Sequence, residues 1–359
     1  MPDPSASRLI IRRPDDWHVH LRDHELLQSV VGYTARQFGR AIVMPNLSPP
    51  VTTVAQAAAY RDRIRAALHP AHASFEPLMT CYLTDESDPA EVERGFEDRV
   101  FAACKLYPAH ATTNSEHGVT DVSRIRGVLE RMQRIGMPLL VHGEVTDPAV
   151  DVFDREAVFI ERVFSKILAD FPEVKAVFEH VTTAEAVSFV ESRGANVAAT
   201  ITPHHLRINR NAMFEGGIRP HFYCLPVAKR ERHRLALRRA ATSGSTKFFL
   251  GTDSAPHSIG KKEAACGCAG VFNAPFAIES YAATFEEEGA LDRLEAFASE
   301  HGPNFYGLPL NEERVVLERG PCRVPERLEA GREEIVPFHA GEELNWRFKG
   351  SAAAAQAVP

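Results

Sequence analysis

The sequence predicts an α/β fold in which one chain forms a (β/α)₈ barrel of the TIM type. Eight short apolar runs recur along the chain, each bounded by turn-forming or polar residues. Longer segments of helical period separate these runs, which is the pattern of repeated strand–helix units. Eight parallel strands close a barrel, and reactive side chains stand at the ends of several runs, where barrel enzymes carry their sites.

The predicted strands follow one another along most of the chain. They occupy residues 16–21, 40–45, 77–82, 101–106, 138–142, 175–180, 196–201 and 247–251. Between them, residues 53–68 have an alanine-rich face, and residues 122–135 end at Gly136, a typical helix stop. Each intervening segment is long enough to connect two parallel strands.

An open doubly wound sheet is the alternative arrangement of such units. It usually carries a glycine-rich phosphate-binding turn after its first strand. Here the first strand leads into residues 21–24 (LRDH), which contain no glycine. The sequence shows no internal repeat and no long linker, so we expect a single catalytic domain over residues 8–348. Residues 349–359, which include SAAAAQAVP, are expected to form a disordered tail.

Composition and charge argue against several classes of partner. The 359 residues are 44% hydrophobic and 25% charged, as in a soluble globular protein. No run approaches the roughly 18 apolar residues of a membrane span. The first residues, MPDPSASRLI, do not resemble a secretory signal, so we expect a cytoplasmic location. A net charge of -7 offers no general attraction for nucleic acid, which leaves a small molecule as the expected partner.

The six cysteines do not form paired zinc-binding motifs, and we expect them to be reduced. Cys266 and Cys268 lie close enough together to raise a metal or redox question. A structural zinc site usually needs a second pair of ligands, so this interpretation is disfavoured. Cys104 should point away from the barrel interior, toward the helices, because its neighbour Lys105 lies on the opposite face of the strand.

Candidate metal ligands stand at the ends of four predicted strands. His18 and His20 lie two residues apart on the first strand, and the two-residue period of a strand points both imidazoles to one face. His142 ends the fifth strand, His180 ends the sixth and Asp253 follows the eighth. Because the carboxyl ends of barrel strands meet at one mouth, we expect these five side chains to share a site.

Lys105 lies near the end of the fourth predicted strand, FAACKL, where a buried ammonium group is costly. There are two physical solutions. Lys105 pairs with a carboxylate, or carbon dioxide converts its amine to a carbamate, an anion that can bridge two metals. The residue type alone favours the ion pair, whereas the five surrounding ligand candidates favour the carbamate.

This set of ligands makes zinc the expected metal, although manganese or cobalt would also fit. Two zinc ions that share a bridging water would lower its pKa toward neutrality and present hydroxide as a nucleophile. Asp253 would then accept the proton and deliver it to a leaving nitrogen, as general base and then general acid. Amide hydrolysis needs both the activated nucleophile and the proton transfer.

A series of motifs carries a resemblance to a known family. The chain contains, in order, RRPDDWHVHLRD, RAIVMPNLSPPVTT, CKLYPAHATTNSEHGVT, MPLLVHGEV, FEHVTT, GGIRPHFYCLP, FLGTDSAPH and CGCAGVFNAP. Over nearly its whole length it closely resembles the compact bacterial dihydroorotases, which are homodimeric members of the amidohydrolase superfamily. The resemblance implies a metal-dependent amidohydrolase barrel, a homodimer, and reversible conversion of N-carbamoyl-L-aspartate to (S)-dihydroorotate in pyrimidine (UMP) synthesis.

The resemblance also implies a cofactor: two Zn²⁺ ions per subunit, bridged by N6-carboxylated Lys105 and a hydroxide. One ion would be held by His18, His20, carboxylated Lys105 and Asp253. The other would be held by Lys105, His142 and His180.

The same resemblance implies a set of substrate-binding residues. Arg22, Asn46 and His257 would bind the free carboxylate of the substrate, for which the planar fork of donors on Arg22 is well suited. Residues 109–118 would form a lid whose Thr112 and Thr113 hydroxyls contact the bound ring and exclude water. Backbone groups at three further positions would pair with the ring amides: Leu225, Ala255 and Ala269.

Three other functions fit the sequence less well. Hydantoinase-like relatives usually carry an additional β-sandwich built partly from residues before the first histidine pair, and the chain before His18 is too short to contribute to one. A deaminase on the same barrel predicts one metal and no bridging lysine, which Lys105 argues against. A catalytically inactive binding subunit should lack a ligand or the base, yet all six positions are present. One departure from the family is His204, where we expect glutamine, and we interpret it as a supporting or surface group.

Overall fold

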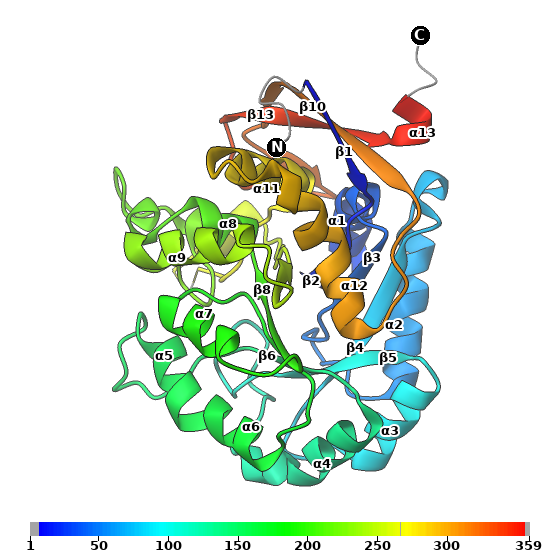
Figure 1. Cartoon of the computed structure of the whole chain (residues 1–359), viewed down its shortest axis with the longest axis vertical. Coiled ribbons are helices and arrows are strands. Elements are labelled where there is room, and N and C mark those ends of the chain that lie inside the picture. The colour runs from blue at the N-terminus through cyan, green and yellow to red at the C-terminus, as the bar shows by residue number, and fades with distance from the viewer. Residues whose placement is uncertain (1–6, 266, 356–359) are drawn as a thin grey trace.

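The computed structural model describes residues 7–265 and 267–355, and its centre is a parallel eight-stranded barrel (Figure 1). The sheet order is β2-β3-β4-β5-β6-β7-β8-β9, with every neighbouring pair parallel. These strands are β2 (Asp16–Val19), β3 (Arg40–Val43), β4 (Glu76–Tyr82), β5 (Phe101–Leu106), β6 (Leu139–Val141), β7 (Ala176–Phe178), β8 (Val197–Ile201) and β9 (Phe248–Leu250). A parallel bridge between Val19 and Ser254 brings the first strand beside the chain that follows the last, so the barrel is nearly closed. The predicted fold is confirmed.

Helices surround the barrel, as Figure 1 shows. The α-helices are α1 (His24–Gln37), α2 (Val54–Ala67), α3 (Pro89–Glu97), α4 (Arg126–Ile135), α5 (Arg155–Phe159), α6 (Ser165–Asp170), α7 (Ala184–Glu191), α8 (Pro203–Arg207), α9 (Glu231–Thr242), α10 (Ile259–Lys262), α11 (Ala277–Glu287), α12 (His301–Tyr306) and α13 (Ala352–Ala355). Shorter 3₁₀ or π turns are η1 (Pro70–His72), η2 (Val122–Ile125), η3 (Ile160–Phe164), η4 (Arg210–Met213), η5 (Pro220–Phe222), η6 (Ala274–Phe276), η7 (Leu291–Arg293) and η8 (Ala296–Glu300). None of these described helices is long and apolar enough to cross a membrane.

Local sequence signals explain the two helices predicted from the sequence. Thr53 caps α2 with a capping box, in which the Thr53 side chain accepts from Gln56 N and the Gln56 side chain accepts from the Thr53 backbone. Helix α4 continues directly from η2 and ends at Gly136, whose φ of 71° lies in the left-handed region that glycine tolerates.

The core has two layers, one inside the barrel and one between strands and helices. The inner layer is a packed cluster of eight buried side chains: Trp17, Ile42, Met44, Ala103, Leu140, Val177, Ala198 and Phe249. Tyr306 of α12 stacks on Trp17, with ring centroids 4.4 Å apart, which continues this inner core. Cys104 belongs to the outer layer, as predicted from its alternation with Lys105.

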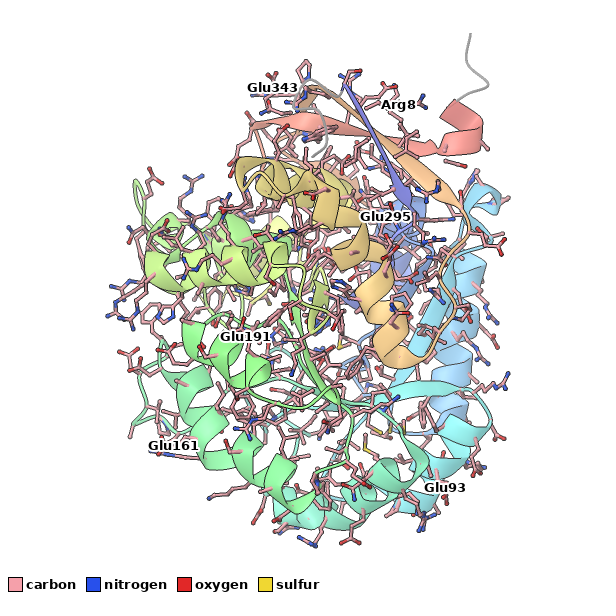
Figure 2. The ribbon with its side chains drawn as sticks, viewed as in Figure 1. Arg8, Glu93, Glu161, Glu191, Glu295 and Glu343 are labelled. Atoms are coloured by element: carbon pink, nitrogen blue, oxygen red, sulfur yellow. The ribbon has the colours of Figure 1, made fainter. Side chains whose placement is uncertain are left out.

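A second, antiparallel sheet was not predicted. Strands β1 (Arg8–Arg12) and β13 (Glu343–Ser351) flank β10 (Arg314–Arg323) on either side. Arg8 and Glu343 mark this sheet at the top of Figure 2. A small hairpin, β11 (Leu328–Ala330) and β12 (Glu333–Ile335), lies in the chain between β10 and β13.

The expected domain boundary at residue 348 falls inside β13. Gly350 pairs with Val316 and Ser351 pairs with Val315, so the strand continues past the expected boundary. Helix α13 follows directly, and residues 356–359 of the expected tail lie outside the described residues. Residues 349–351 are ordered because this part of β13 pairs with β10, a partner that the local composition of these residues does not reveal.

Candidate metal centre and substrate pocket

Predicted metal ligands from different strands meet at one end of the barrel. Asp253 Oδ1 lies 3.2 Å from His18 Nε2 and 3.1 Å from His20 Nε2, and the two imidazole nitrogens are 3.3 Å apart. Zn–N and Zn–O distances of about 2.0–2.1 Å give about 3.3–3.4 Å between neighbouring ligands of a tetrahedral ion. These three atoms therefore have the spacing of one face of a zinc coordination shell.

The other two histidines lie beside this triad. The His180 ring is 4.9 Å, between centroids, from both the His18 ring and the His142 ring. His18, Glu179 and His180 also offer ligand atoms that all lie within 4.8 Å of one another. All four histidines are buried, because they lie at the ends of apolar strands. The structure thus brings together His18, His20, His142, His180 and Asp253.

Unusual backbone geometry aims two of these side chains. His180 has a φ of 41° and Asp253 a φ of 46°, values that L-residues adopt only at a cost in free energy. The His180 amide donates to Thr200 Oγ1 at 2.7 Å, and the Asp253 amide donates to the His18 carbonyl at 2.8 Å. These contacts hold the strained residues where β7 and β9 have ended.

Lys105 is fully buried and forms an ion pair with Glu179. Its Nζ also lies 4.7 Å from the centroid of the Tyr107 ring. This is the first of the two solutions that the sequence left open, in which the amine pairs with a carboxylate. Glu179 itself was not predicted as a functional residue, although its position immediately before His180 at a strand end was a usable signal.

A second carboxylate that the sequence reasoning missed is Glu144. Its Oε2 lies 2.8 Å from His142 Nε2, and both side chains are buried. Since Nε2 is engaged by this hydrogen bond, Nδ1 is the nitrogen of His142 that remains to bind a metal. Its place two residues after His142 in the chain was again the available signal.

The buried charges shift the pKa values of the site. Burial alone would lower the pKa of His18, but Glu179 and Asp253 outweigh it and raise the pKa to about 9. Burial lowers the pKa of His20 to about 4, against the attraction of Asp253. Burial also opposes ionisation of Asp253, yet His18 and His20 hold the pKa of its carboxyl well below the usual range. An ionised Asp253 and a neutral His20 are the forms that a metal requires, whereas His18 must lose the proton that its raised pKa favours.

The predicted carboxylate-binding residues lie next to the histidines. Arg22 Nη2 lies 2.9 Å from His257 Nε2, and Arg22 Nε donates to the Pro256 carbonyl at 3.1 Å. Asn46 Oδ1 lies 2.9 Å from His20 Nδ1, while Asn46 Nδ2 donates to the Thr113 carbonyl at 3.0 Å. Asn46 therefore connects the histidine cluster to the segment predicted as a lid.

The space enclosed by these residues is small. A cavity of about 20 Å³ is lined by most of the predicted residues: His18, His20, Arg22, Asn46, Thr112, Thr113, His142, His180, Leu225, Asp253, Ala255 and Ala269, together with Tyr107, Cys224 and Gly270. Two predicted site residues are not part of this lining: His257, which contacts Arg22, and Lys105, which pairs with Glu179. Such a volume holds about one water molecule. Thr112 and Thr113 of the predicted lid line the cavity, and Thr113 Oγ1 donates to the carbonyl of Ala269, another lining residue, at 3.4 Å.

A further buried cluster lies near the cavity: His204, His205 and Cys224. His204 is fully buried, with Nδ1 3.0 Å from Asn273 Nδ2, so it supports the interior and is no surface group. Both ring nitrogens of His205 are engaged, Nδ1 by Thr202 Oγ1 at 2.8 Å and Nε2 by a carbonyl at 3.0 Å. The question raised by Cys266 and Cys268 falls partly outside the described residues, because Cys266 is not among them.

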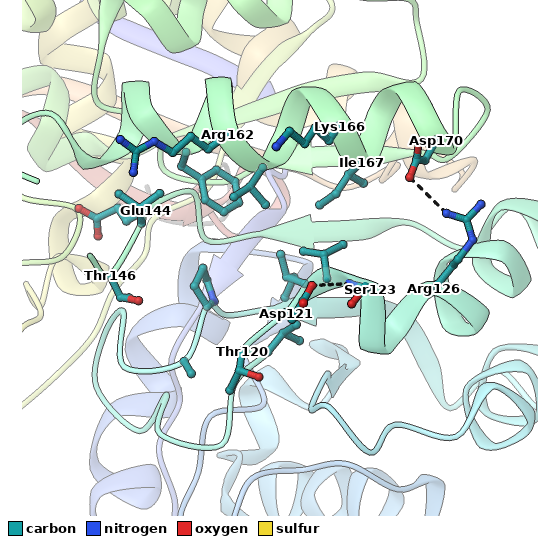
Figure 3. A pocket seen from close by; sticks show the side chains of 18 of the residues that line it. Thr120, Asp121, Ser123, Arg126, Glu144, Thr146, Arg162, Lys166, Ile167 and Asp170 are labelled. Atoms are coloured by element: carbon teal, nitrogen blue, oxygen red, sulfur yellow. Dashed lines mark hydrogen bonds and ion pairs between the residues drawn. The ribbon is translucent and has the colours of Figure 1, made fainter. Parts of the chain in front are cut away.

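A much larger cavity, of about 750 Å³, lies outside the barrel between α4 and the helical segment α5–η3–α6 (Figure 3). Its charged groups partly pair with one another, as Arg126 and Asp170 do at 3.2 Å. Among the described residues, none of the predicted ligands or substrate-binding residues lines it, although Ala109 and His110 of the predicted lid do, and His110 is the one histidine in the lining. We therefore assign the chemistry to the small cavity.

Comparison with known proteins shows which proteins this chain is similar to. The model of the amidohydrolase family matches residues 10–312. A dihydroorotase of Novosphingobium aromaticivorans is 68% identical over 340 residues, which cover 95% of this chain and 98% of the relative. The crystal structure of Saccharomyces cerevisiae dihydroorotase in complex with 5-fluoroorotic acid superimposes with a TM-score of 0.89, at 32% identity over 96% of this chain and 99% of that one. A Campylobacter jejuni dihydroorotase structure gives 0.87 at 35% identity, covering 95% of this chain and 97% of that one.

Proposed function

The chain belongs to the amidohydrolase family and, within it, to the dihydroorotases, and from this premise we propose a zinc-dependent mechanism for the reversible interconversion of (S)-dihydroorotate and N-carbamoyl-L-aspartate. The observation that carries the proposal is the triangle of His18 Nε2, His20 Nε2 and Asp253 Oδ1, with sides of 3.1, 3.2 and 3.3 Å. The two imidazole nitrogens lie close to each other and to one carboxylate oxygen. A cation bound by all three atoms would stabilise this arrangement.

The donor atoms divide into two groups. We propose that His18, His20 and Asp253 hold one zinc ion, that His142 and His180 hold a second, and that carboxylated Lys105 joins both. This role for Lys105 is supported by Glu179, which contacts Lys105 and His18 and offers a ligand atom within 4.8 Å of one on His180. When bound, the two ions supply Lewis acidity and lower the pKa of a water molecule toward neutrality.

Asp253 has the environment of a catalytic base. Its carboxylate is ionised, and at 6% exposure it is shielded from bulk water. In ring opening, the oxygen of water forms a bond to the ring carbonyl carbon and the carbon–nitrogen bond breaks. Asp253 accepts the proton that the water loses and delivers it to the departing nitrogen. Ring closure follows the same steps in reverse.

The polar residues around the cavity orient the substrate. We assign the substrate carboxylate to Arg22, Asn46 and His257. Asn46 contacts His20, and Arg22 contacts His257. Thr112 and Thr113 would contact the ring from above, and the backbone at Leu225, Ala255 and Ala269 would pair with its amides. Because the cavity holds about one water molecule, residues 109–118 must move aside to admit the substrate.

Further properties of the protein remain proposals that follow from the family. We propose that the barrel and its antiparallel sheet, which extends to Ser351, act as one catalytic domain, that two copies form a homodimer, and that the enzyme works in the cytoplasm in pyrimidine synthesis. Light scattering of the purified protein tests the dimer, which predicts twice the mass of the 359-residue chain.

The experiment that tests the function combines metal analysis with a ring-closure assay on N-carbamoyl-L-aspartate. We expect two zinc ions per chain and formation of dihydroorotate, with both lost after chelation and restored by zinc. Bound zinc without turnover would favour the alternative, a catalytically inactive binding subunit on the same barrel. Turnover by a protein free of metal would contradict the zinc-dependent mechanism.

A further inference from the structure

Two buried glutamates stand directly behind the candidate metal ligands, and neither belongs to the predicted ligand set. Glu179 contacts His18 and Lys105, whereas Glu144 contacts His142. We propose that each glutamate is a positioning residue for a different metal site, Glu179 for the site of His18 and His20 and Glu144 for the site of His142 and His180. The inference deepens the proposed function and rests on it.

Glu179 uses both of its oxygens on metal ligands. Oε1 lies 2.9 Å from His18 Nδ1, and Oε2 pairs with Lys105 Nζ. The contact is an ion pair by distance and lacks hydrogen-bond geometry. A carboxylate beside Nδ1 favours keeping a proton on that nitrogen, so a cation would displace the proton of Nε2, which faces His20 and Asp253. The side chain is fully buried, so no solvent competes for these contacts. Glu179 therefore fixes the orientation of His18, whereas its ion pair with Lys105 belongs to the amine before carboxylation.

Glu144 orients His142 as Glu179 orients His18, but it contacts the Nε2 atom of the ring where Glu179 contacts Nδ1. Its Oε2 lies 2.8 Å from His142 Nε2, which leaves Nδ1 as the ligand atom. The second oxygen, Oε1, is buried and has no hydrogen-bond partner among the residues that the structure describes. Glu144 also lines the large outer cavity, and Figure 3 shows its carboxylate at one end of that space. His142 is the partner that accounts for a carboxylate in this buried place.

The physical effect of such a pair is known in general terms. A carboxylate that accepts a hydrogen bond from a metal-bound imidazole orients the ring and makes it more basic, and its loss typically weakens metal binding by about 10- to 100-fold. A glutamine keeps the shape of the side chain and removes the charge. Glu179→Gln and Glu144→Gln therefore test the charge with little change in packing. Glu279→Gln is the matched control, because Glu279 is also buried but lies on α11 and contacts the backbone of β13.

The test measures zinc binding, apart from activity. The four proteins, wild type and the three glutamine variants, are stripped of metal and titrated with zinc against a competing chelator, and anomalous diffraction from zinc-soaked crystals assigns each ion to its site. We expect Glu179→Gln to weaken the ion beside His18 and His20 by about 10- to 100-fold. Glu144→Gln should weaken the ion beside His142 and His180 by a similar factor, and Glu279→Gln should match wild type.

The possible outcomes separate this inference from the proposed function. Wild-type affinity at both sites in both variants would overturn the inference while leaving the function intact, and so would equal losses in all three variants. A wild-type protein that binds no zinc would overturn the proposed function itself. If Glu179→Gln does not fold, Glu179→Asp and Glu179→Ala replace it: the aspartate, which retains the charge, should retain more zinc than the alanine, and equal loss in both would refute the role of Glu179.

Discussion

Replacing Arg22 with methionine gives the sharpest test of how the substrate is held. Arg22 donates from Nε to the Pro256 carbonyl and uses one hydrogen of Nη2 in its contact with His257. The hydrogens of Nη1 and the second hydrogen of Nη2 can therefore bind a carboxylate. Methionine has a similar length and no charge. Two charge-assisted hydrogen bonds contribute about 1.5 kcal/mol each at the low end of the usual range, or about 3 kcal/mol together.

Since about 1.4 kcal/mol corresponds to a tenfold change in affinity, we expect KM to rise on the order of 100-fold. The value of kcat should change much less, because the carboxylate is bound equally in the ground state and the transition state. Initial rates of ring opening over a range of dihydroorotate concentrations give both constants. Arg126→Met is the matched control: Arg126 lines the large outer cavity, where we place no substrate.

An unchanged KM for Arg22→Met would show that the carboxylate is held elsewhere. A raised KM for Arg126→Met would go further and place the substrate in the outer cavity.

Three further predictions concern the base, the lid and the stability of the fold. Asp253→Ala should leave the circular dichroism spectrum unchanged and lower kcat by at least about 10²- to 10⁴-fold, the usual contribution of general acid–base catalysis, and unaltered turnover would remove Asp253 from this role. Thr113→Val should raise KM about fivefold through the loss of one hydrogen bond of about 1 kcal/mol, whereas an unchanged KM would leave the lid without a substrate contact. Burial raises the pKa of Glu279 from 4.5 to about 7, so its contribution to stability is complete below pH 4.5 and is lost as the pH rises to 7. The shift of about 2.5 pH units, 7 minus 4.5, corresponds to about 3 kcal/mol. Urea unfolding should therefore show Glu279→Gln gaining about that much relative to wild type between pH 4 and pH 8, and a difference independent of pH would contradict the assignment.

The barrel was predictable because its signals are local. Each strand is a short apolar run whose neighbours in space are also its neighbours in sequence order. The predicted strands extended too far where site residues follow the end of the strand. Residues 175–180 were predicted as one strand, yet β7 ends at Phe178, because Glu179 and His180 leave the ladder and His180 adopts a positive φ. Such a turn is imposed by tertiary contacts such as the bond to Thr200, which no local pattern reveals.

The antiparallel sheet shows the opposite case. Its strands β1 and β10 lie about three hundred residues apart in the chain, and Arg8 pairs with Glu318. Alternation within each strand is visible in the sequence, but the partner of each strand is not. The same limit explains why β13 was assigned partly to a tail.

The sequence predicted the candidate metal ligands but not Glu179 and Glu144, the carboxylates that contact them. His18 and His20 followed from the period of a strand, and His142, His180 and Asp253 from the rule that barrel strands end at one mouth. The carboxylate partner of Lys105 could be predicted only as a possibility, because which strand places a glutamate opposite it depends on barrel geometry.

The most direct test of the central claim is a crystal structure of the zinc-loaded protein, with anomalous diffraction recorded on both sides of the zinc absorption edge. Two zinc peaks are predicted, one among His18, His20 and Asp253 and one beside His142 and His180, with the density of a carbamate on Lys105 Nζ between them. A single peak, or none, with the Lys105 amine unmodified and still paired with Glu179, would contradict the account.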